Sequence, residues 1–533
     1  MNAELRKNLG AYYTDQKVAN FLASWAIRNP NDKVLDPSYG DGVFLLAASH
    51  QLKSKGIKKN PAIYGIDIQS QLRLSIFAST TNLIHSDFFK VEPSELEQMD
   101  VVVGNPPFIR YQRFNGDTRK SALKICKQVG AELPELSSSW APFLIHATRF
   151  LRHGGRLAMV VPAEINHATY AIPVIKYFLS KFRSIKIIAF RKRIFPELSQ
   201  DTYCLLADDY GEKCENLSLV LADSANSLES LNLDNGKLLG IESIRTGKTR
   251  LIENLISDES RSIYHSLVNG ELSKRLGEIS KVGIGYVTGA NEYFHLTESE
   301  VEKYQVPKEL LKPAIRSGRQ LKGIRFAFSD WEQSRLEGEK SWLLAIPSNY
   351  KNLPDPLIEY LDFGIKTGIN TAYKCKVREV WYSVPHIYVG DAFLSYMSGN
   401  TPRLVANTAG VVASNSLHLV SILNKEIISS ESLSYLWNTS FTMMSSEIEG
   451  HALGGGMLKL EPSEAEKISV PFPKQLISSD EMSHLDNLLR MGEFESALDY
   501  ADKTILVDRL GLTKQDCIAL KDGFNLLRSW RMR

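Results

Sequence analysis

Between residues 33 and 208, short runs rich in β-branched and other apolar residues alternate with segments of helical periodicity. Such alternation is typical of a mostly parallel sheet with helices on both faces, so the sequence predicts an α/β domain. Seven strands are expected, over residues 33–36, 62–67, 82–85, 100–105, 156–162, 184–190 and 202–208. The expected helices include residues 42–53, 69–78, 138–152 and 168–182, the third closed by Gly154-Gly155 as a C-cap.

The length of 533 residues exceeds what one ordinary hydrophobic core organises and suits two or three domains. The regular alternation stops at a polar stretch, DDYGEKCENLS, which is typical of a domain edge. We therefore expect a first domain over residues 1–245 and a second, α+β domain over residues 246–533. The second would combine glycine-rich β-like segments with a mostly helical tail from about residue 479.

Composition excludes several classes of protein. Hydrophobic residues make up 43% of the chain and charged residues 23%, and no run is long and apolar enough for a membrane helix. The N-terminus, MNAELRKNLG, lacks the apolar stretch of a signal peptide, so we expect a cytoplasmic protein. The 5 cysteines include no CxxC pair, and the 11 histidines form no HxxxH or HExxH pair. The sequence predicts neither a disulfide framework nor a metal site.

The net charge of +2 conceals an asymmetry between the two parts of the chain. Residues 1–210 carry 27 Lys and Arg against 19 Asp and Glu, a net +8, whereas the remainder carries 36 against 42, a net −6. A basic first part is weak evidence for a bound polyanion, because ordinary solvated surfaces vary by similar amounts.

Three loops that follow expected strands carry glycine or carboxylate side chains. The segment VLDPSYGDGVFLLAA runs strand, tight loop and helix, and Gly40 and Gly42 would let the backbone approach a ligand beside the helix N-terminus. A plain tight turn explains that loop equally well if it is taken alone. Asp67 ends the next strand, where a carboxylate accepts hydrogen bonds from ribose hydroxyls, and Asp87 follows the third, where it accepts from an adenine amino group. Such loops converge at the carboxyl edge of a sheet, which predicts one nucleoside site.

The fourth expected strand ends in Asn105-Pro106-Pro107-Phe108. An adenine amino nitrogen attacks carbon poorly because its lone pair is delocalised into the ring. The side-chain carbonyl of Asn105 and the backbone carbonyl of Pro106 would each accept one amino hydrogen, which favours a tetrahedral nitrogen with its lone pair available. The prolines hold the backbone stiffly, and Phe108 would stack on the base. A chance proline-rich turn is the alternative, and the position after the fourth strand argues against it.

Two glycine motifs in the second half of the chain resemble nucleotide-binding loops, but neither is predicted to bind a nucleotide. Gly283-x-Gly285-x-x-x-Gly289 has the wrong spacing for a nucleotide cradle, so we expect a glycine-containing strand or loop. Gly247-Lys248-Thr249 lacks the upstream glycine of a phosphate-binding P-loop, so ATP binding is not predicted.

Seven motifs stand in order over nearly all of residues 9–208: GAYYTDQKVANFLA, DPSYGDG, GIDI, HSDFF, GNPPF, GGRLAMVVPAE and FPELSQDTYCLL. Together they resemble the adenine-N6 DNA methyltransferases of restriction–modification systems, in the TaqI-like group with an N-terminal cofactor motif and a C-terminal target recognition domain. The resemblance continues more loosely through KVGIGYVTGANEYF, KPAIRSGRQLKG, RLVANTAGVVASNSLHLV and ALGGGMLKLEPSEAEKISVP. It implies a Rossmann-like, mostly parallel seven-stranded methyltransferase sheet followed by an α+β recognition domain.

The resemblance also implies a cofactor, S-adenosyl-L-methionine, and the residues around it. Tyr13 and Thr14 would border its methionine end, Asp36 and Gly40 its amino acid portion, Asp67 its ribose and Asp87 its adenine. Asp36 stands where some members of the family have Glu.

The target implied by the resemblance is an adenine flipped out of double-stranded DNA. Asn105, Pro106 and Phe108 would hold this base, and Phe195 would stack on its opposite face. The family often has Tyr where this chain has Phe108, so only a ring face and no hydroxyl is available. In the second domain, a row of cations suggests contacts to DNA phosphates, although a solvated face explains it equally well: Lys312, Arg316, Arg319, Lys322 and Arg325.

Three other functions are compatible with parts of the pattern. A modification subunit of a multisubunit restriction complex would normally have a helical domain ahead of residue 10, and an RNA or protein-glutamine methyltransferase seldom carries GAYYTDQ before the cofactor strand. A non-catalytic DNA-binding module would not need an intact NPPF. The early cofactor motif leaves no room for an N-terminal nuclease domain, so we expect a stand-alone methyltransferase with a separate restriction endonuclease as a possible partner.

Overall fold

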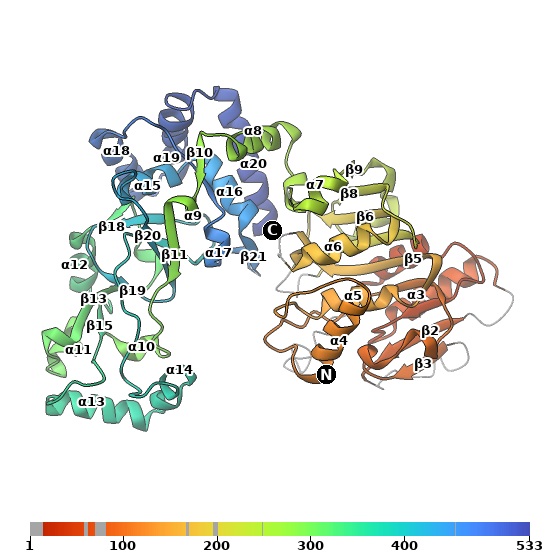
Figure 1. Cartoon of the computed structure of the whole chain (residues 1–533), viewed down its shortest axis with the longest axis horizontal. Coiled ribbons are helices and arrows are strands. Elements are labelled where there is room, and N and C mark those ends of the chain that lie inside the picture. The colour runs from red at the N-terminus through yellow and green to blue at the C-terminus, as the bar shows by residue number, and fades with distance from the viewer. Residues whose placement is uncertain are drawn as a thin grey trace. The chain divides into compact units, whose positions relative to one another are not determined.

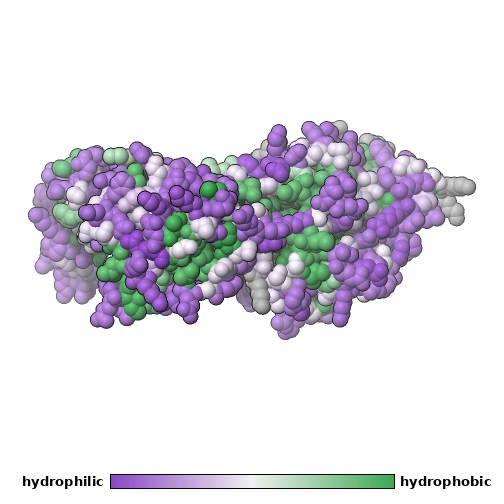
Figure 2. Space-filling model, turned by 90° about the horizontal axis from the view of Figure 1, so that it is seen from above, coloured by the Kyte–Doolittle hydropathy of each residue, from purple (hydrophilic) through white to green (hydrophobic). Residues whose placement is uncertain are grey.

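The computed structural model describes residues 14–57, 62–69, 81–166, 170–195, 201–247, 249–453 and 455–533. The chain forms two compact units that divide between Leu255 and Ile256 (Figure 1). None of the helices in these described ranges is both long and apolar enough to cross a membrane. On the face drawn in Figure 2, hydrophilic side chains predominate, and hydrophobic ones are confined to separate patches.

A nine-stranded sheet forms the centre of the first unit, in the order β3-β2-β1-β4-β5-β7-β6-β8-β9. Its strands are β1 (Val34–Asp36), β2 (Ile63–Asp67), β3 (Thr81–His85), β4 (Met99–Gly104), β5 (Leu151–Pro162), β6 (Phe182–Phe190), β7 (Thr202–Tyr210), β8 (Asn216–Ala222) and β9 (Lys237–Leu238). Strands β1 to β5 are parallel, whereas β7 runs antiparallel to β5 and β6. All seven predicted strands are confirmed, and β8 and β9 extend the sheet beyond them.

Helices lie against both faces of this sheet (Figure 1). They are α2 (Gln16–Ala26), α3 (Val43–Ser54), α4 (Gly116–Gln128), α5 (Trp140–Thr148), α6 (Ala171–Leu179) and α7 (Ile241–Thr246). The predictions of helices over residues 42–53 and 168–182 are confirmed by α3 and α6. The helix predicted over residues 69–78 lies outside the described residues except for its first position. Helix α4 was not predicted.

The predicted C-cap at Gly154-Gly155 is wrong. Helix α5 ends at Thr148, and both glycines lie inside β5. The register between β4 and β5 moves from Met99 opposite Leu151 to Val101 opposite Arg156, so β5 carries a bulge at this point. Gly154 has φ +76°, a left-handed conformation that favours glycine, which explains why a glycine pair stands inside a strand.

The second unit combines four sheets with many short helices. Its strands are β10 (Ser273–Arg275), β11 (Ser280–Ile284), β12 (His295–Leu296), β13 (Leu311–Ile315), β14 (Arg325–Phe326), β15 (Trp342–Leu344), β16 (Ala392–Ser395), β17 (Met397–Ser398), β18 (Leu404–Asn407), β19 (Val412–Ala413), β20 (Leu417–Ile422), β21 (His451–Leu453), β22 (Met457–Lys459) and β23 (Ser469–Pro471). The largest sheet has the order β11-β20-β16-β18-β14. Gly283 lies in β11 and Gly285 directly follows it, as expected for a glycine-containing strand or loop.

Helices complete this α+β unit. They are α8 (Asp258–Asn269), α9 (Leu276–Ile279), α10 (Asn291–Phe294), α11 (Glu298–Lys303), α12 (Phe328–Leu336), α13 (Asp355–Lys366), α14 (Tyr373–Lys376), α15 (Ser430–Trp437), α16 (Ser440–Glu449), α17 (Pro462–Ala465), α18 (Ser479–Arg490), α19 (Phe494–Ala501) and α20 (Lys514–Met532). Helices α18 to α20 confirm the predicted helical tail.

A buried ion pair joins α20 to α16 in the core of the second unit. The Arg531 guanidinium donates to both carboxylate oxygens of Glu447, at 2.9 and 2.7 Å, and each side chain is only 3% exposed. Its remaining N–H groups donate to the backbone carbonyls of Gly399, Asn400 and Gly456. Burial raises the pKa of Glu447, and the bonds from Arg531 oppose that rise.

We expect Arg531→Met to lower the free energy of unfolding of the second unit by about 3–5 kcal/mol, because it leaves a buried carboxylate without its cation. Urea denaturation checks this value. The control is Arg528→Met on the same helix, whose ion pair with Glu495 is longer and more exposed. Adding Glu447→Leu to Arg531→Met should recover most of the loss, and an Arg531→Met protein as stable as the parent would contradict the prediction.

Candidate active site

Four neighbouring parallel strands, β3, β2, β1 and β4, end at the same edge of the first sheet. Asp36 is the last residue of β1 and Asp67 the last of β2, while Asp87 follows β3 and Asn105 directly follows β4. Because ligands of such sheets lie beyond the carboxyl ends of the strands, these four predicted side chains share one site.

Asp36 is fully buried, and only one of its oxygens has a partner. Its Oδ1 accepts from the backbone N–H of Ser38 at 3.1 Å, whereas its Oδ2 has no partner among the described residues. Burial raises the pKa of Asp36 well above its ordinary value, with smaller contributions from Asp67 and Asp41. A Cβ at Gly104 would lie 2.9 Å from Asp36 Oδ1, so only glycine lets β4 end here. Such a carboxylate suits a cationic or N–H donor from a ligand.

Asp67 is tied to the glycine loop between β1 and α3. Its Oδ2 accepts from the backbone N–H of Gly40 at 2.9 Å, and its Oδ1 accepts from the N–H of Gln69 at 2.7 Å. A carboxylate has about four acceptor positions, so each oxygen retains capacity for a ligand hydroxyl. The structure therefore brings Gly40 and Asp67 together, as the sequence predicts.

Asp87 is oriented by a residue that the sequence analysis missed. Its Oδ1 accepts from the backbone N–H of Phe89 at 3.1 Å, and its Oδ2 accepts from Thr118 Oγ1 at 3.0 Å. Thr118 belongs to α4, and no motif marks it in the sequence. Two fixed bonds hold the carboxylate in one rotamer, which is what a recognition group requires.

The side-chain amide of Asn105 is held so that its oxygen stays free. Its Nδ2 donates to Thr14 Oγ1 at 3.2 Å, and its backbone carbonyl accepts from Ser38 Oγ at 3.0 Å. The buried Oδ1 has no partner among the described residues. Thr14 was predicted to border the cofactor, and this bond gives it a further role in orienting Asn105. Tyr13 lies outside the described residues.

Ser139, directly before α5, holds the rest of the NPPF turn. Its hydroxyl accepts from the backbone N–H of Ile109 at 2.9 Å and donates to the carbonyl of Pro107. Its own N–H donates to the carbonyl of Ile109 at 3.0 Å. Sequence reasoning missed Ser139, because its hydroxyl makes no cap bond to α5 and instead contacts a turn about thirty residues away in the sequence.

The two predicted stacking rings are both largely buried, Phe108 at 9% and Phe195 at 7% exposure. Within the part of the chain that the structure describes, no ring contact joins them, and the five residues after Phe195 are not described. Their stacking on opposite faces of one base stays a prediction.

The predicted row of cations is spread over several elements of the second unit. Lys312 lies in β13, Arg319 in a turn and Arg325 in β14, because the segment folds as strand, turn and strand. Arg316 pairs with Glu292 and Arg325 with Glu431, while Lys312, Arg319 and Lys322 are exposed. Their contact with DNA stays a prediction.

Comparison with known proteins identifies both halves of the chain. Residues 1–230 match the family model N-6 DNA Methylase, and residues 248–506 match the C-terminal domain of the type II methyltransferase M.Eco57I. The N-terminal part of the chain is therefore an N-6 DNA methylase domain.

Individual relatives of this N-6 DNA methylase cover most of its length. It is 24% identical over 483 residues to the type II methyltransferase M.AccI of Acinetobacter calcoaceticus, covering 88% of the chain and 86% of that protein. It is 19% identical over 496 residues to M.XamI of Xanthomonas campestris pv. amaranthicola, with the same coverage. The restriction–modification enzyme MmeI, solved in complex with DNA, shares its fold with a TM-score of 0.59 and 11% identity, over 99% of this chain and 80% of that one.

The residues at the sheet edge fit S-adenosyl-L-methionine, the cofactor of this class of enzyme. Asp36 offers an unpartnered buried oxygen suited to an ammonium group, and Asp67 lies beside the glycine loop with remaining acceptor capacity. Asp87 is fixed at the end of the neighbouring strand. The donor set of this N-6 DNA methylase therefore matches a ligand with an amino acid end and a nucleoside end.

We expect Ser139→Ala to lower kcat about ten- to a hundredfold with little change in cofactor affinity, because a buried N–H and a carbonyl of the NPPF turn would lose their partner. Single-turnover methylation measures the effect. Ser139→Thr keeps the hydroxyl and should restore most of the rate. The control is Ser137→Ala, a neighbouring buried serine that bonds only the carbonyl of Pro134. Equal losses in both alanine variants would contradict the prediction.

Proposed function

We propose that this N-6 DNA methylase transfers a methyl group from S-adenosyl-L-methionine to N6 of an adenine at a specific sequence in duplex DNA. The observation that carries the proposal is the buried, unpartnered Oδ1 of Asn105, fixed beside the carboxyl edge that would hold the nucleoside. A free acceptor at this position suits an amino group that must give up conjugation with its ring.

Asn105 and Pro106 would act on the target nitrogen as a pair of acceptors. Asn105 Oδ1 and the Pro106 carbonyl each take one amino hydrogen, which directs the nitrogen lone pair away from the ring. Positive charge develops on the nitrogen as it attacks, and these oxygens stabilise it. The excess proton leaves after transfer, so no strong base is needed. Thr14 keeps the amide from rotating, because it accepts from the Nδ2 end.

The cofactor, when bound, supplies an electrophilic methyl group on a sulfonium. Asp36 would hold its ammonium group, Asp67 its ribose hydroxyls and Asp87 its adenine amino group. The acidic character of this edge also suits a cationic ligand over an anionic one. All of these residues act in binding and orientation, not in proton transfer.

The target base would leave the helix before it reacts, because a stacked base cannot present its amino group to a closed pocket. Phe108 offers a ring face to the base, and its lack of a hydroxyl limits it to stacking. Phe195 would cover the opposite face. Burial of both rings against the domain core provides the rigid walls that such a pocket needs.

The two compact units would divide the work. We propose that the catalytic domain comprises residues 1–245, with the unit continuing to Leu255, and that the following residues form the target recognition domain. In this arrangement methylation protects DNA in the cytoplasm against a restriction endonuclease that acts as a separate protein.

Expression in a host without adenine methylation tests the proposal. Single-molecule sequencing of plasmid DNA should reveal N6-methyladenine at every copy of one short sequence. Unmodified adenine throughout, in a host that accumulates folded protein, would overturn it.

We expect Asp67→Ala to raise the cofactor Kd at least about tenfold, because a charge-assisted hydrogen bond contributes roughly 1.5–3 kcal/mol. Isothermal titration calorimetry measures it. Glu229→Ala is the control, an exposed carboxylate elsewhere in the same unit. An unchanged Kd in Asp67→Ala would place this residue outside the cofactor site.

A further inference from the structure

One corner of the second unit exposes cations and apolar side chains together. We call residues 373–389 the α14 corner, since this segment begins with helix α14. Lys374 and Lys376 are exposed on it. So are four large side chains: Tyr373 (74% exposed), Val377 (63%), Tyr388 (45%) and Val389 (54%).

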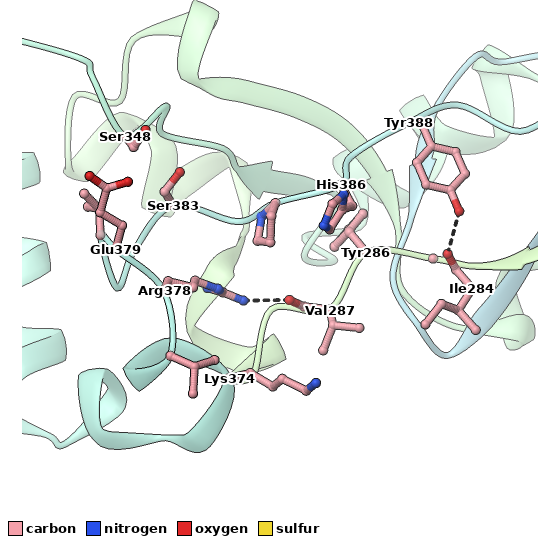
Figure 3. Close-up of a pocket in the computed structure, with 14 residues that line it drawn as sticks. Ile284, Tyr286, Val287, Ser348, Lys374, Arg378, Glu379, Ser383, His386 and Tyr388 are labelled. Carbon is pink, nitrogen blue, oxygen red and sulfur yellow. Dashed lines mark hydrogen bonds between the residues drawn. The ribbon is translucent and has the colours of Figure 1, made fainter.

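A cavity of about 730 Å³ lies between the α14 corner and the end of β11. Figure 3 shows Ser348, Glu379 and Ser383 near one another on one side of it and His386 beside Tyr286 on another. The lining thus presents hydroxyls, a carboxylate and an imidazole, a mixture of hydrogen-bond donors and acceptors.

Both ends of the corner are anchored to the strand region opposite. The Arg378 guanidinium donates to the backbone carbonyl of Val287 at 2.6 Å (Figure 3). It also donates to the carbonyl of Thr288 at 2.7 Å. Tyr388 Oη donates to the carbonyl of Ile284 at 3.1 Å. These bonds fix the walls, so the cavity is preformed and does not depend on a mobile loop.

His386 stands in the cavity wall with φ +57°, a left-handed conformation that costs a non-glycine residue free energy. Its side chain is exposed in the cavity wall. Such strain is typical of residues that are held in place for recognition.

Neither lysine has an acidic partner among the described residues, whereas several other cations of the second unit do. Arg316 pairs with Glu292, Arg325 with Glu431 and Lys425 with Asp391. Unpaired lysines interleaved with exposed tyrosines suit a sugar–phosphate backbone, because lysine contacts phosphates as a point charge and rings pack against sugars and bases.

We propose that the α14 corner is a DNA-contacting and sequence-reading surface of the second unit, an inference that rests on the proposed function. Lys374 and Lys376 contact phosphates, and Glu379, Ser383 and His386 meet base edges at the cavity. Phosphate contacts position the protein on DNA of any sequence, whereas hydrogen bonds from the mixed donors and acceptors to base edges distinguish one sequence from another.

The first experiment measures binding of the full chain to cognate and random duplexes between 50 and 200 mM salt. Lys374→Ala/Lys376→Ala should weaken binding to the cognate and to the random duplex by a similar factor. It should also reduce the slope of log affinity against log salt by roughly 0.9 for each phosphate that the protein no longer neutralises. The matched control is Lys503→Ala/Lys514→Ala, which removes the same charge from exposed positions of the helical tail. Equal slopes of log affinity against log salt in the two double variants would contradict the proposal that Lys374 and Lys376 contact phosphates.

The second experiment follows sequence preference with a library of duplexes that each differ from the cognate site at one position. Glu379→Gln should relax the preference at one position by about five- to a hundredfold and leave binding to random DNA unchanged. Glu337→Gln, an exposed carboxylate elsewhere in the unit, is the control. If the parent enzyme methylates its site and Glu379→Gln leaves the sequence preference unaltered, Glu379 does not read the sequence. A parent enzyme that methylates no duplex would instead overturn the proposed function.

Discussion

Asn105→Ala should lower kcat by at least about a hundredfold while the cofactor Kd stays close to that of the parent enzyme. Removing one preorganised hydrogen-bonding partner of a developing charge costs roughly a hundred- to a thousandfold in comparable sites. The side chain bonds only Thr14 and makes no contact with Asp36, Asp67 or Asp87 in the described hydrogen bonds. Single-turnover kinetics and calorimetry give the two quantities separately.

Asn20→Ala serves as the control for that experiment, since it removes an exposed amide from α2 in the same unit. Asn105→Asp keeps an acceptor oxygen but loses the N–H that bonds Thr14, so its rate should lie between those of the parent and the alanine variant. Weakened cofactor binding with normal turnover in Asn105→Ala would contradict the role assigned to this residue.

A chain ended at Leu255 should bind the cofactor but lose discrimination between cognate and random duplexes, by about a thousandfold or more. Specific complexes exceed non-specific ones by roughly 10³–10⁷ in affinity, and that difference comes from contacts with base edges. If these contacts lie in the second unit, the fragment keeps only the sequence-independent attraction of its basic surface.

Circular dichroism and cofactor titration establish first that the fragment is folded. The control is the full chain with Asn105→Ala, which should discriminate normally in a binding assay and yet not methylate. A folded fragment that methylated only the cognate site would place recognition in the first unit and contradict the assigned division.

Seven strands of the first unit could be predicted because each is a short apolar run bounded by turn residues, and their alternation with helices indicates a mostly parallel sheet. The error at Gly154-Gly155 has a tertiary cause. A C-cap and a strand bulge both use glycine in a left-handed conformation, and only the pairing with β4 distinguishes them.

The acidic residues of the candidate site could be predicted for the same reason. Asp36, Asp67 and Asp87 each stand at or just after the end of a strand, so topology alone brings them together. Ser139 and Thr118 could not, because a hydrogen-bonding partner from a distant helix leaves no local pattern.

Mass spectrometry of nucleosides is the most direct test of the central claim. Duplex DNA containing the methylated sequence is incubated with purified full-length protein and methyl-labelled S-adenosyl-L-methionine, then digested completely. We expect the label in N6-methyldeoxyadenosine from the DNA, and no label there when Asn105→Ala replaces the parent enzyme. Label in cytosine, in RNA or in protein, with adenine unmodified, would contradict it.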